Sequence, residues 1–222
     1  MGQVVRLVAD DGHEFSAYRA DPEGPPRGSL VVIQEVFGVN EHIRQVCDRF
    51  ADRGFSALAP ALFDRLRPGV ELAYDEEGIS QGRALVGELG WDKPVIDVAA
   101  AARALRPDLK AGVVGYCWGG TVTWLAACRL DVACGVAYYG RQIVDFLDER
   151  PRCPVMMHFG AGDALIPLAT VSKVEAAFPG IPVYRYEGAG HGFNCDRRSD
   201  YRPEAAAAAL DRTLTFFDNT LP

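Results

Sequence analysis

The chain has 222 residues, which suits one domain with a substantial core, and its composition is that of an ordinary soluble globular protein. Its formal net charge is −7 and it has no basic cluster, which argues against nucleic acid or a membrane surface as a partner. The N-terminus does not resemble a signal peptide, and no apolar run approaches membrane-spanning length. We therefore expect residues 1–222 to form a single domain in the cytoplasm.

The six cysteines show no spacing typical of a zinc or dithiol motif. No two are separated by two residues, and the closest pair is Cys128 and Cys134. The four histidines include no pair at the spacing of metal ligands. We expect free thiols in a reducing cytoplasm, with neither a bound metal nor a cofactor.

In the first half of the chain, strand-like and helical segments alternate after an N-terminal hairpin. In chain order they are strands 3–8, 14–19 and 29–33, a helix over 41–53, a strand over 55–59, and helices over 76–89 and 92–105. Residues 60–75 are irregular and rich in turns. Long connections of this kind often carry substrate contacts, although their side chains, here Arg65, Arg67, Tyr74 and also Arg83, are more commonly solvated surface.

The second half continues the alternation. It predicts a strand over 112–115, a helix over 121–129, strands over 133–140 and 154–160, a helix over 170–178, a strand over 182–187, and a closing amphipathic helix over 203–221. Strands that alternate with helices form a mostly parallel sheet covered on both faces. The fold class is therefore α/β.

Residues 112–120 carry the most specific local signal. A short apolar strand leads into Gly115-Tyr116-Cys117-Trp118-Gly119-Gly120, and a helical run follows. A strand that turns sharply into a helix, with glycines on both sides of one reactive side chain, is a nucleophile elbow. The helix N-terminus favours a thiolate and a developing oxyanion. The alternative for Cys117 is a buried thiol in a glycine-rich turn.

An acid and a histidine follow in the order that an elbow requires. Asp163 comes after the strand over 154–160, and His191 comes after the strand over 182–187. Since the carboxyl ends of parallel strands share one edge of a sheet, both can converge on Cys117. Separately, Asp163 could cap a helix near residue 168 and His191 could be an ordinary loop histidine.

The other polar candidates are weaker. Glu35 directly follows the buried strand over 29–33, although an exposed loop carboxylate is the simpler interpretation. His13 lies in the hairpin turn, and His42 lies on an early helix. His158 lies inside a strand, where we expect a core histidine.

Together these motifs resemble the dienelactone hydrolase family, a branch of the α/β-hydrolases, over nearly the whole chain. The matching segments are residues 34–40 (Gln-Glu-Val-Phe-Gly-Val-Asn), 115–120, 138–140 (Tyr-Tyr-Gly), 162–163 and 190–193 (Gly-His-Gly-Phe). The resemblance implies an α/β-hydrolase fold. It also implies a nucleophile at Cys117, a base and acid at His191 and an orienting carboxylate at Asp163.

The resemblance assigns further roles around this triad. The backbone N–H groups of Val36 and Trp118 would form the oxyanion hole, and Phe37, Tyr139 and Arg83 are candidate substrate contacts. Glu35 would contact Cys117 and help to generate the thiolate when substrate binds. A carboxylate beside a thiol opposes its ionisation, so we expect Cys117 to rest largely as a thiol.

The chain departs from the family where arginines hold a substrate carboxylate. One such position, shortly after the catalytic histidine, is Cys195 here, and near Ser80 and Gln81 no arginine aligns, Arg83 being displaced. This weakens the reason to prefer an anionic lactone. Substitute positive charges would come from Arg65, Arg141 or Arg197.

The expected activity is hydrolysis of small esters or lactones through an acyl-cysteine, without a cofactor, by a monomer or small homo-oligomer. Three alternatives stay open on the same fold. They are a binding module without turnover, a redox-sensing thiol protein and a peptidase. The first would keep the pocket but lose a triad member, and the second predicts oxidation of Cys117 without esterase activity.

Overall fold

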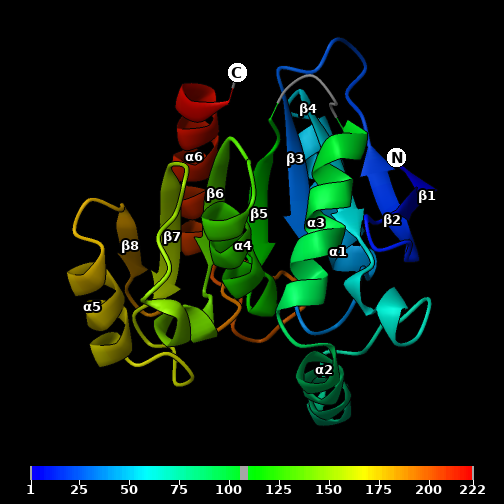
Figure 1. Cartoon of the computed structure of the whole chain (residues 1–222). Helices are drawn as coiled ribbons and strands as arrows, with labels where there is room; N and C mark the ends of the chain where they lie inside the picture. Colours follow the sequence, from blue (N-terminus) through cyan, green and yellow to red (C-terminus); the bar gives the residue numbers. More distant parts are fainter. Residues whose placement is uncertain (1, 106–109, 222) are drawn as a thin grey trace.

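One twisted sheet of eight strands runs through the computed structural model, which describes residues 2–105 and 110–221 (Figure 1). The strand order is β1-β2-β4-β3-β5-β6-β7-β8. Strand β2 is antiparallel to both of its neighbours, and the strands from β4 to β8 are parallel to one another. The predicted mostly parallel α/β sheet is confirmed.

The strands match the predicted segments closely. They are β1 (Gln3–Val8), β2 (Glu14–Ala20), β3 (Gly28–Ile33), β4 (Phe55–Pro60), β5 (Gly112–Tyr116), β6 (Cys134–Tyr138), β7 (Val155–Gly160) and β8 (Val183–Tyr186). Strands β3 to β7 are buried along their whole length, because helices cover both of their faces. This burial explains why they are continuous apolar runs.

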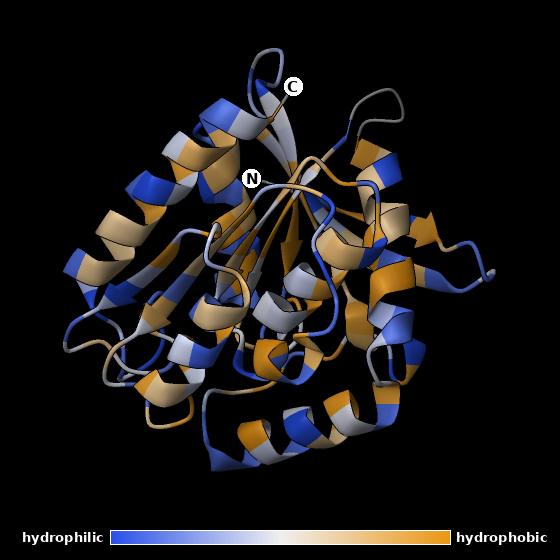
Figure 2. Ribbon diagram, turned by 60° about the vertical axis from the view of Figure 1, so that its left-hand side comes forward, coloured by the Kyte–Doolittle hydropathy of each residue, from blue (hydrophilic) through white to orange (hydrophobic). Residues whose placement is uncertain are grey.

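The helices form two layers around the sheet. They are α1 (Glu41–Ala51), α2 (Glu76–Leu89), α3 (Asp92–Leu105), α4 (Trp118–Arg129), α5 (Leu168–Ala177) and α6 (Pro203–Thr220). Alternate residues of β3 pack into two different hydrophobic core clusters. Leu30 packs in the cluster of Ile43 from α1, whereas Val31 packs in the cluster of Val98 from α3. The apolar strands accordingly lie between helices in Figure 2.

Three local features differ from the predicted pattern. Helix α4 begins at Trp118, three residues earlier than predicted, so that Cys117 is its N-cap. Strand β6 ends at Tyr138 because Tyr139 has a positive φ of 38°, which extended backbone does not allow. Two 3₁₀ helices, η1 (Leu62–Arg65) and η2 (Arg141–Phe146), occupy connections that carried no periodic signal.

Among the described helices, none combines the length and the apolar character that a membrane crossing requires.

Candidate active site

Cys117 lies in a strained turn between β5 and α4. Its φ and ψ are 55° and −117°, a conformation that L-residues rarely adopt and that needs support from surrounding packing. A Cβ atom on Gly115 would come within 2.1 Å of the carbonyl oxygen of Gly119, and one on Gly119 would come within 2.4 Å of that of Gln34. The glycines are therefore required by close backbone approach, and the motif is a nucleophile elbow.

Cys117, His191 and Asp163 meet at the carboxyl edge of the sheet. Nε2 of His191 lies 3.1 Å from Sγ of Cys117, and its Nδ1–H donates to Oδ2 of Asp163 over 2.7 Å. Each residue follows a different strand, β5, β8 and β7, as the sequence predicted. The imidazole thus bridges a thiol and a carboxylate, which is the geometry of a proton-transfer triad.

The carboxylate of Asp163 is fixed by its own loop. Its Oδ1 accepts hydrogen bonds from the backbone N–H groups of Leu165 and Ile166, at 2.7 and 3.1 Å, and its Oδ2 is left for His191. The alternative that Asp163 caps α5 does not hold, because the N-cap of that helix is Pro167. Asp163 instead hydrogen-bonds the imidazole of His191.

The electrostatic setting raises the proton affinity of His191. Burial alone lowers the pKa of this imidazole, but the Cys117 sulfur and the Asp163 carboxylate outweigh burial and raise it to about 10. A proton that leaves the thiol is therefore well held on the imidazole. This is what a general base beside a nucleophile needs.

Glu35 is buried rather than an exposed loop carboxylate. The residue is 1% exposed, and neither carboxylate oxygen has a hydrogen-bond partner among the described residues. Its counter-charge is Arg198, whose Nη1 lies 3.6 Å from Oε1. A buried carboxylate needs such a partner, because desolvation of an unpaired charge is costly.

Sequence reasoning missed Arg198. The family position for an arginine after His191 is Cys195 here, and Arg197 was the expected substitute in this loop. Arg197 instead pairs with Glu41 on α1, at 2.8 Å. The available signal was the pair of adjacent arginines in this loop, Arg197 and Arg198. Only Arg198 lies beside Glu35.

A cleft of about 540 Å³ opens onto Cys117 and His191. Its walls combine apolar, aromatic and charged side chains from six regions of the chain. The lining residues are Val36, Arg83, Val86, Gly87, Gly90, Trp91, Cys117, Trp118, Arg141, Gln142, Asp145, Leu165 and His191. Val36 and Trp118, the candidate oxyanion-hole residues, both contribute to this cleft, and α2 approaches Val36 closely at Gly82.

The candidate substrate contacts divide into two groups. Arg83 lines the cleft, whereas Phe37 and Tyr139 do not and are almost completely buried. The Tyr139 ring packs edge-on against His191, with ring centroids 5.2 Å apart, and Phe37 packs on Tyr74. Neither side chain lines the cleft in this structure, so a role of Phe37 or Tyr139 as a substrate contact stays a prediction.

The arginines considered as substitute positive charges also lie in different surroundings. Arg141 lies in the cleft, together with the acidic Asp145. Arg65 is instead held by Asp97 and Asp11, both at 2.7 Å. Arg65 therefore offers no free charge to a ligand.

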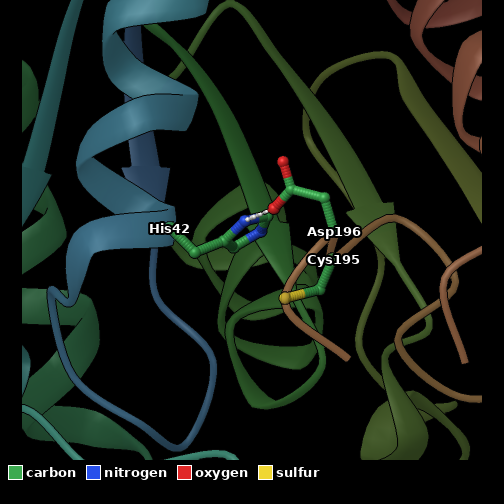
Figure 3. A group of neighbouring side chains, drawn as sticks. All are labelled: His42, Cys195 and Asp196. Atoms are coloured by element: carbon green, nitrogen blue, oxygen red, sulfur yellow. Dashed lines mark hydrogen bonds and ion pairs between the residues drawn. The ribbon is translucent and has the colours of Figure 1, made fainter. Parts of the chain in front are cut away.

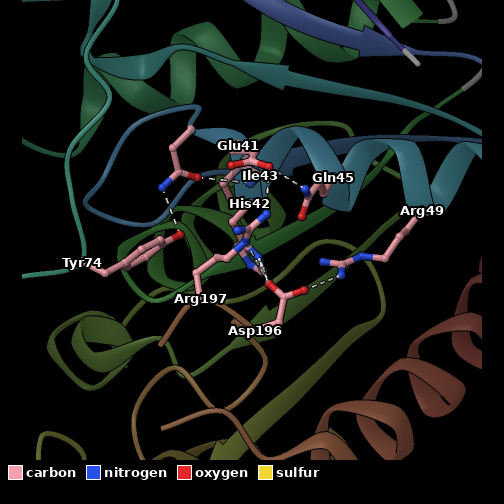
Figure 4. A network of polar contacts seen from close by, with 9 residues as sticks. Glu41, His42, Ile43, Gln45, Arg49, Tyr74, Asp196 and Arg197 are labelled. Carbon is pink, nitrogen blue, oxygen red and sulfur yellow. Dashed lines mark hydrogen bonds and ion pairs between the residues drawn. The ribbon is translucent and has the colours of Figure 1, made fainter. Parts of the chain in front are cut away.

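Two of the remaining histidines are buried. His158 is a core histidine, as predicted, and it hydrogen-bonds Tyr186 and Thr213. His42 lies on α1, where its Nδ1 contacts Oδ1 of Asp196 at 3.0 Å (Figure 4). Burial lowers the pKa of both imidazoles.

Comparison with known proteins places the whole chain in one group. The sequence model of the Dienelactone hydrolase family matches residues 15–221. A carboxymethylenebutenolidase from Pseudomonas putida is 34% identical, over 96% of this chain and 94% of that protein. A Synechocystis protein provisionally named carboxymethylenebutenolidase is also 34% identical, over 96% and 95% of the two chains.

A solved structure agrees with these sequence relatives. A Klebsiella pneumoniae protein, provisionally named dienelactone hydrolase, superposes with a TM-score of 0.84 at 29% identity. The alignment covers 97% of this chain and 98% of the other. The sheet, its helical layers and these neighbours define an α/β-hydrolase fold.

Proposed function

Because the chain belongs to the dienelactone hydrolase family, and is thus a hydrolase of carboxylic esters or lactones, we propose that it acts through an acyl-cysteine on Cys117. The observation that carries the proposal is the position of His191. Its two nitrogens lie within hydrogen-bonding distance of the Cys117 sulfur and of the Asp163 carboxylate, and both Cys117 and His191 line the cleft. Sulfur, imidazole and carboxylate in this order are the parts of a nucleophilic triad.

In the acylation step, Sγ of Cys117 attacks the carbonyl carbon of the substrate, and Nε2 of His191 holds the proton from the thiol. The tetrahedral intermediate then collapses, its C–O bond breaks, and His191 passes the proton to the leaving alkoxide. Asp163 keeps Nδ1 protonated and stabilises the imidazolium. For a lactone, the leaving alkoxide stays attached to the acyl group.

In the deacylation step, His191 takes a proton from a water molecule as that water attacks the thioester. The C–S bond breaks, the carboxylic acid leaves, and the proton returns to the sulfur. The backbone N–H groups of Val36 and Trp118 hold the negative oxygen in both steps. Trp118 is the first residue of α4, where the N–H has no partner within the helix.

Glu35 is the proposed activating group for Cys117. Its charge opposes a resting thiolate, whereas Arg198 partly neutralises that charge and the raised pKa of His191 favours transfer of the proton. If substrate binding strengthens the contact of Glu35 with Arg198, the charge of Glu35 opposes ionisation of the Cys117 thiol less, and the thiolate forms. Thiol titration with and without a substrate analogue tests this step, and a resting thiol fully ionised at neutral pH would reject it.

The cleft favours small substrates. A volume of about 540 Å³ lies in the range of pockets that enclose a small organic molecule. Arg83 and Arg141 supply positive charge there, and Asp145 offsets part of it. We therefore propose small esters and lactones as the substrate class, without specifying the acyl group of the substrate.

The decisive experiment is a panel of esters and lactones, including p-nitrophenyl acetate and dienelactone, on the wild type and on Cys117→Ala. We expect the wild type to hydrolyse at least one member and Cys117→Ala to hydrolyse none. An acetyl adduct on Cys117, seen by intact-mass and peptide analysis, would identify the intermediate. Equal hydrolysis by the two proteins would overturn the nucleophile assignment.

The same panel separates the alternatives. A redox-sensing protein would be oxidised by peroxide at Cys117 while it hydrolyses nothing, and a binding module would retain ligands unchanged. A cytoplasmic location is supported by the six cysteines, all of which are described and free. Labelling of intact cells with membrane-permeant and impermeant thiol reagents tests that location.

A further inference from the structure

A second group of cysteine, histidine and aspartate lies outside the cleft, where α1 faces the loop after His191. The group consists of His42, Cys195 and Asp196, and one ligand atom from each lies within 4.8 Å of the others (Figure 3). His42 comes from α1, and the other two are consecutive residues in the loop. We refer to these three residues as the α1–loop cluster.

We propose that the α1–loop cluster binds one zinc ion. Imidazole nitrogen, thiolate sulfur and carboxylate oxygen are the three donor types that zinc takes from proteins. Three protein donors leave one position of a tetrahedral ion for water. Figure 3 shows the side chains of Cys195 and Asp196 directed toward the ring of His42.

The distances allow an ion with small adjustments. Donor atoms around a tetrahedral zinc lie roughly 3.3–3.8 Å apart, as bond lengths of about 2.0–2.3 Å require. Nδ1 of His42 and Oδ1 of Asp196 are 3.0 Å apart, and no pair in the cluster exceeds 4.8 Å. Zinc would enter between the imidazole and the carboxylate, and two metal bonds would replace one hydrogen bond.

The surrounding contacts hold these donors in place. Arg49 binds Oδ2 of Asp196 at 3.2 Å, which leaves Oδ1 facing His42 (Figure 4). The backbone N–H of Cys195 donates to the carbonyl of Gly192 and fixes the turn. Outer contacts that orient ligands in this way are a regular part of metal sites.

Burial gives the site a dry interior and an entry route. The side chain of His42 is 0% exposed and Cys195 is fully buried, whereas the side chain of Asp196 is 34% exposed. An ion would therefore arrive at Asp196. The guanidinium groups of Arg49 and Arg197 near this carboxylate oppose a further positive charge, so we expect micromolar rather than very tight binding.

Binding releases one proton. The S–H bond of Cys195 breaks, the S–Zn bond forms, and the proton passes to the buffer, while His42 binds through a neutral nitrogen and Asp196 through its carboxylate. The affinity for zinc should therefore rise with pH.

The sequence shows no metal-ligand spacing for this cluster, because His42 and Asp196 are separated by 154 positions in the chain.

The test uses Cys117→Ala protein, stripped of metal, so that the catalytic sulfur cannot contribute. Zinc is titrated against a coloured chelator, and cobalt is then added as a spectroscopic probe. We expect one zinc per chain at micromolar affinity and a thiolate-to-cobalt charge-transfer band. At about a hundredfold excess over the dissociation constant, zinc should raise the unfolding temperature by about 5 °C or more.

Three variants in the same background locate the ion. Cys195→Ser should abolish the charge-transfer band, Asp196→Asn should weaken zinc binding at least tenfold, and Cys128→Ser, a buried thiol on α4, should change neither. Because Asp196 is partly exposed, its variant should fold even if Cys195→Ser does not. Unchanged affinity in Asp196→Asn, or a charge-transfer band that persists in Cys195→Ser, would overturn the proposal. The result does not depend on the proposed hydrolysis, since the protein tested lacks the nucleophile.

Discussion

The molecule contains two groups of cysteine, histidine and aspartate, and they are arranged differently. In the cleft, His191 lies between the sulfur and the carboxylate and contacts both. In the α1–loop cluster, His42 contacts the carboxylate of Asp196 through Nδ1, while its Nε2 has no partner among the described residues. The first arrangement has the geometry for transfer of a proton along a line, whereas the second gathers donor atoms around one point.

The protonation of the two groups differs accordingly. The pKa of His191 is raised to about 10, whereas burial lowers the pKa of His42. The sulfur of Cys117 is partly accessible at a helix N-terminus, while burial raises the pKa of the Cys195 thiol to about 12. The same three residue types therefore give the proposed nucleophile in one place and a buried, un-ionised thiol in the other.

The largest difference should appear when each carboxylate is replaced by an amide. Asp163→Asn should lower kcat/KM by about 10³–10⁴-fold, because the imidazole loses the group that fixes its tautomer. Asp196→Asn should stay within about threefold of the wild type, which is the range for a change outside the catalytic contacts. Steady-state kinetics on one ester measures both, and similar losses in the two variants would remove the distinction.

The two sulfurs should also differ in reactivity. We expect iodoacetamide to alkylate Cys117 about 100-fold faster or more than Cys195, because Cys195 must wait for a local opening of the loop. Peptide mass spectrometry over a time course measures both rates in one sample. Comparable rates would mean that the loop opens readily and that Cys195 is not protected.

Removal of the counter-charge of Glu35 should cost stability. Arg198→Met should lower the free energy of unfolding by about 3 kcal/mol, because it leaves a buried carboxylate unpaired. Arg49→Met removes a more exposed arginine and should cost about 1 kcal/mol or less. Urea unfolding measures both, and adding Glu35→Gln to Arg198→Met should recover most of the loss.

The smallest expected effect is a change in the pH dependence of stability. The pKa of His191 is higher in the folded protein than its ordinary 6.5, so its stabilisation is complete below about pH 6.5 and is lost as the pH rises through about 10. Cys117→Ser removes the contribution of the sulfur and lowers the folded pKa of His191, so the loss, which still begins near pH 6.5, should be smaller and should end about one pH unit lower or more. Melting temperatures between pH 6 and 10 measure it, and superimposable profiles would contradict the coupling.

The meeting of Cys117, Asp163 and His191 could be predicted from the sequence, but their surroundings could not. Cys117, Asp163 and His191 each follow a strand, and the carboxyl ends of parallel strands share an edge, so periodicity alone brings them together. The partners Arg198 and Asp196 lie in an irregular loop, where small changes of backbone direction decide which side chain faces inward. No periodic signal reports those directions, and the contacts span more than a hundred residues.

The crowding at the elbow limits how this chain can change. Gly115 and Gly119 are enclosed by carbonyl oxygens, so even a methyl group at either position would push the strand away from the helix. The side chain at position 117 is only partly covered. The position therefore has room for an oxygen in place of the sulfur, while the peptide that carries it has to remain as it is.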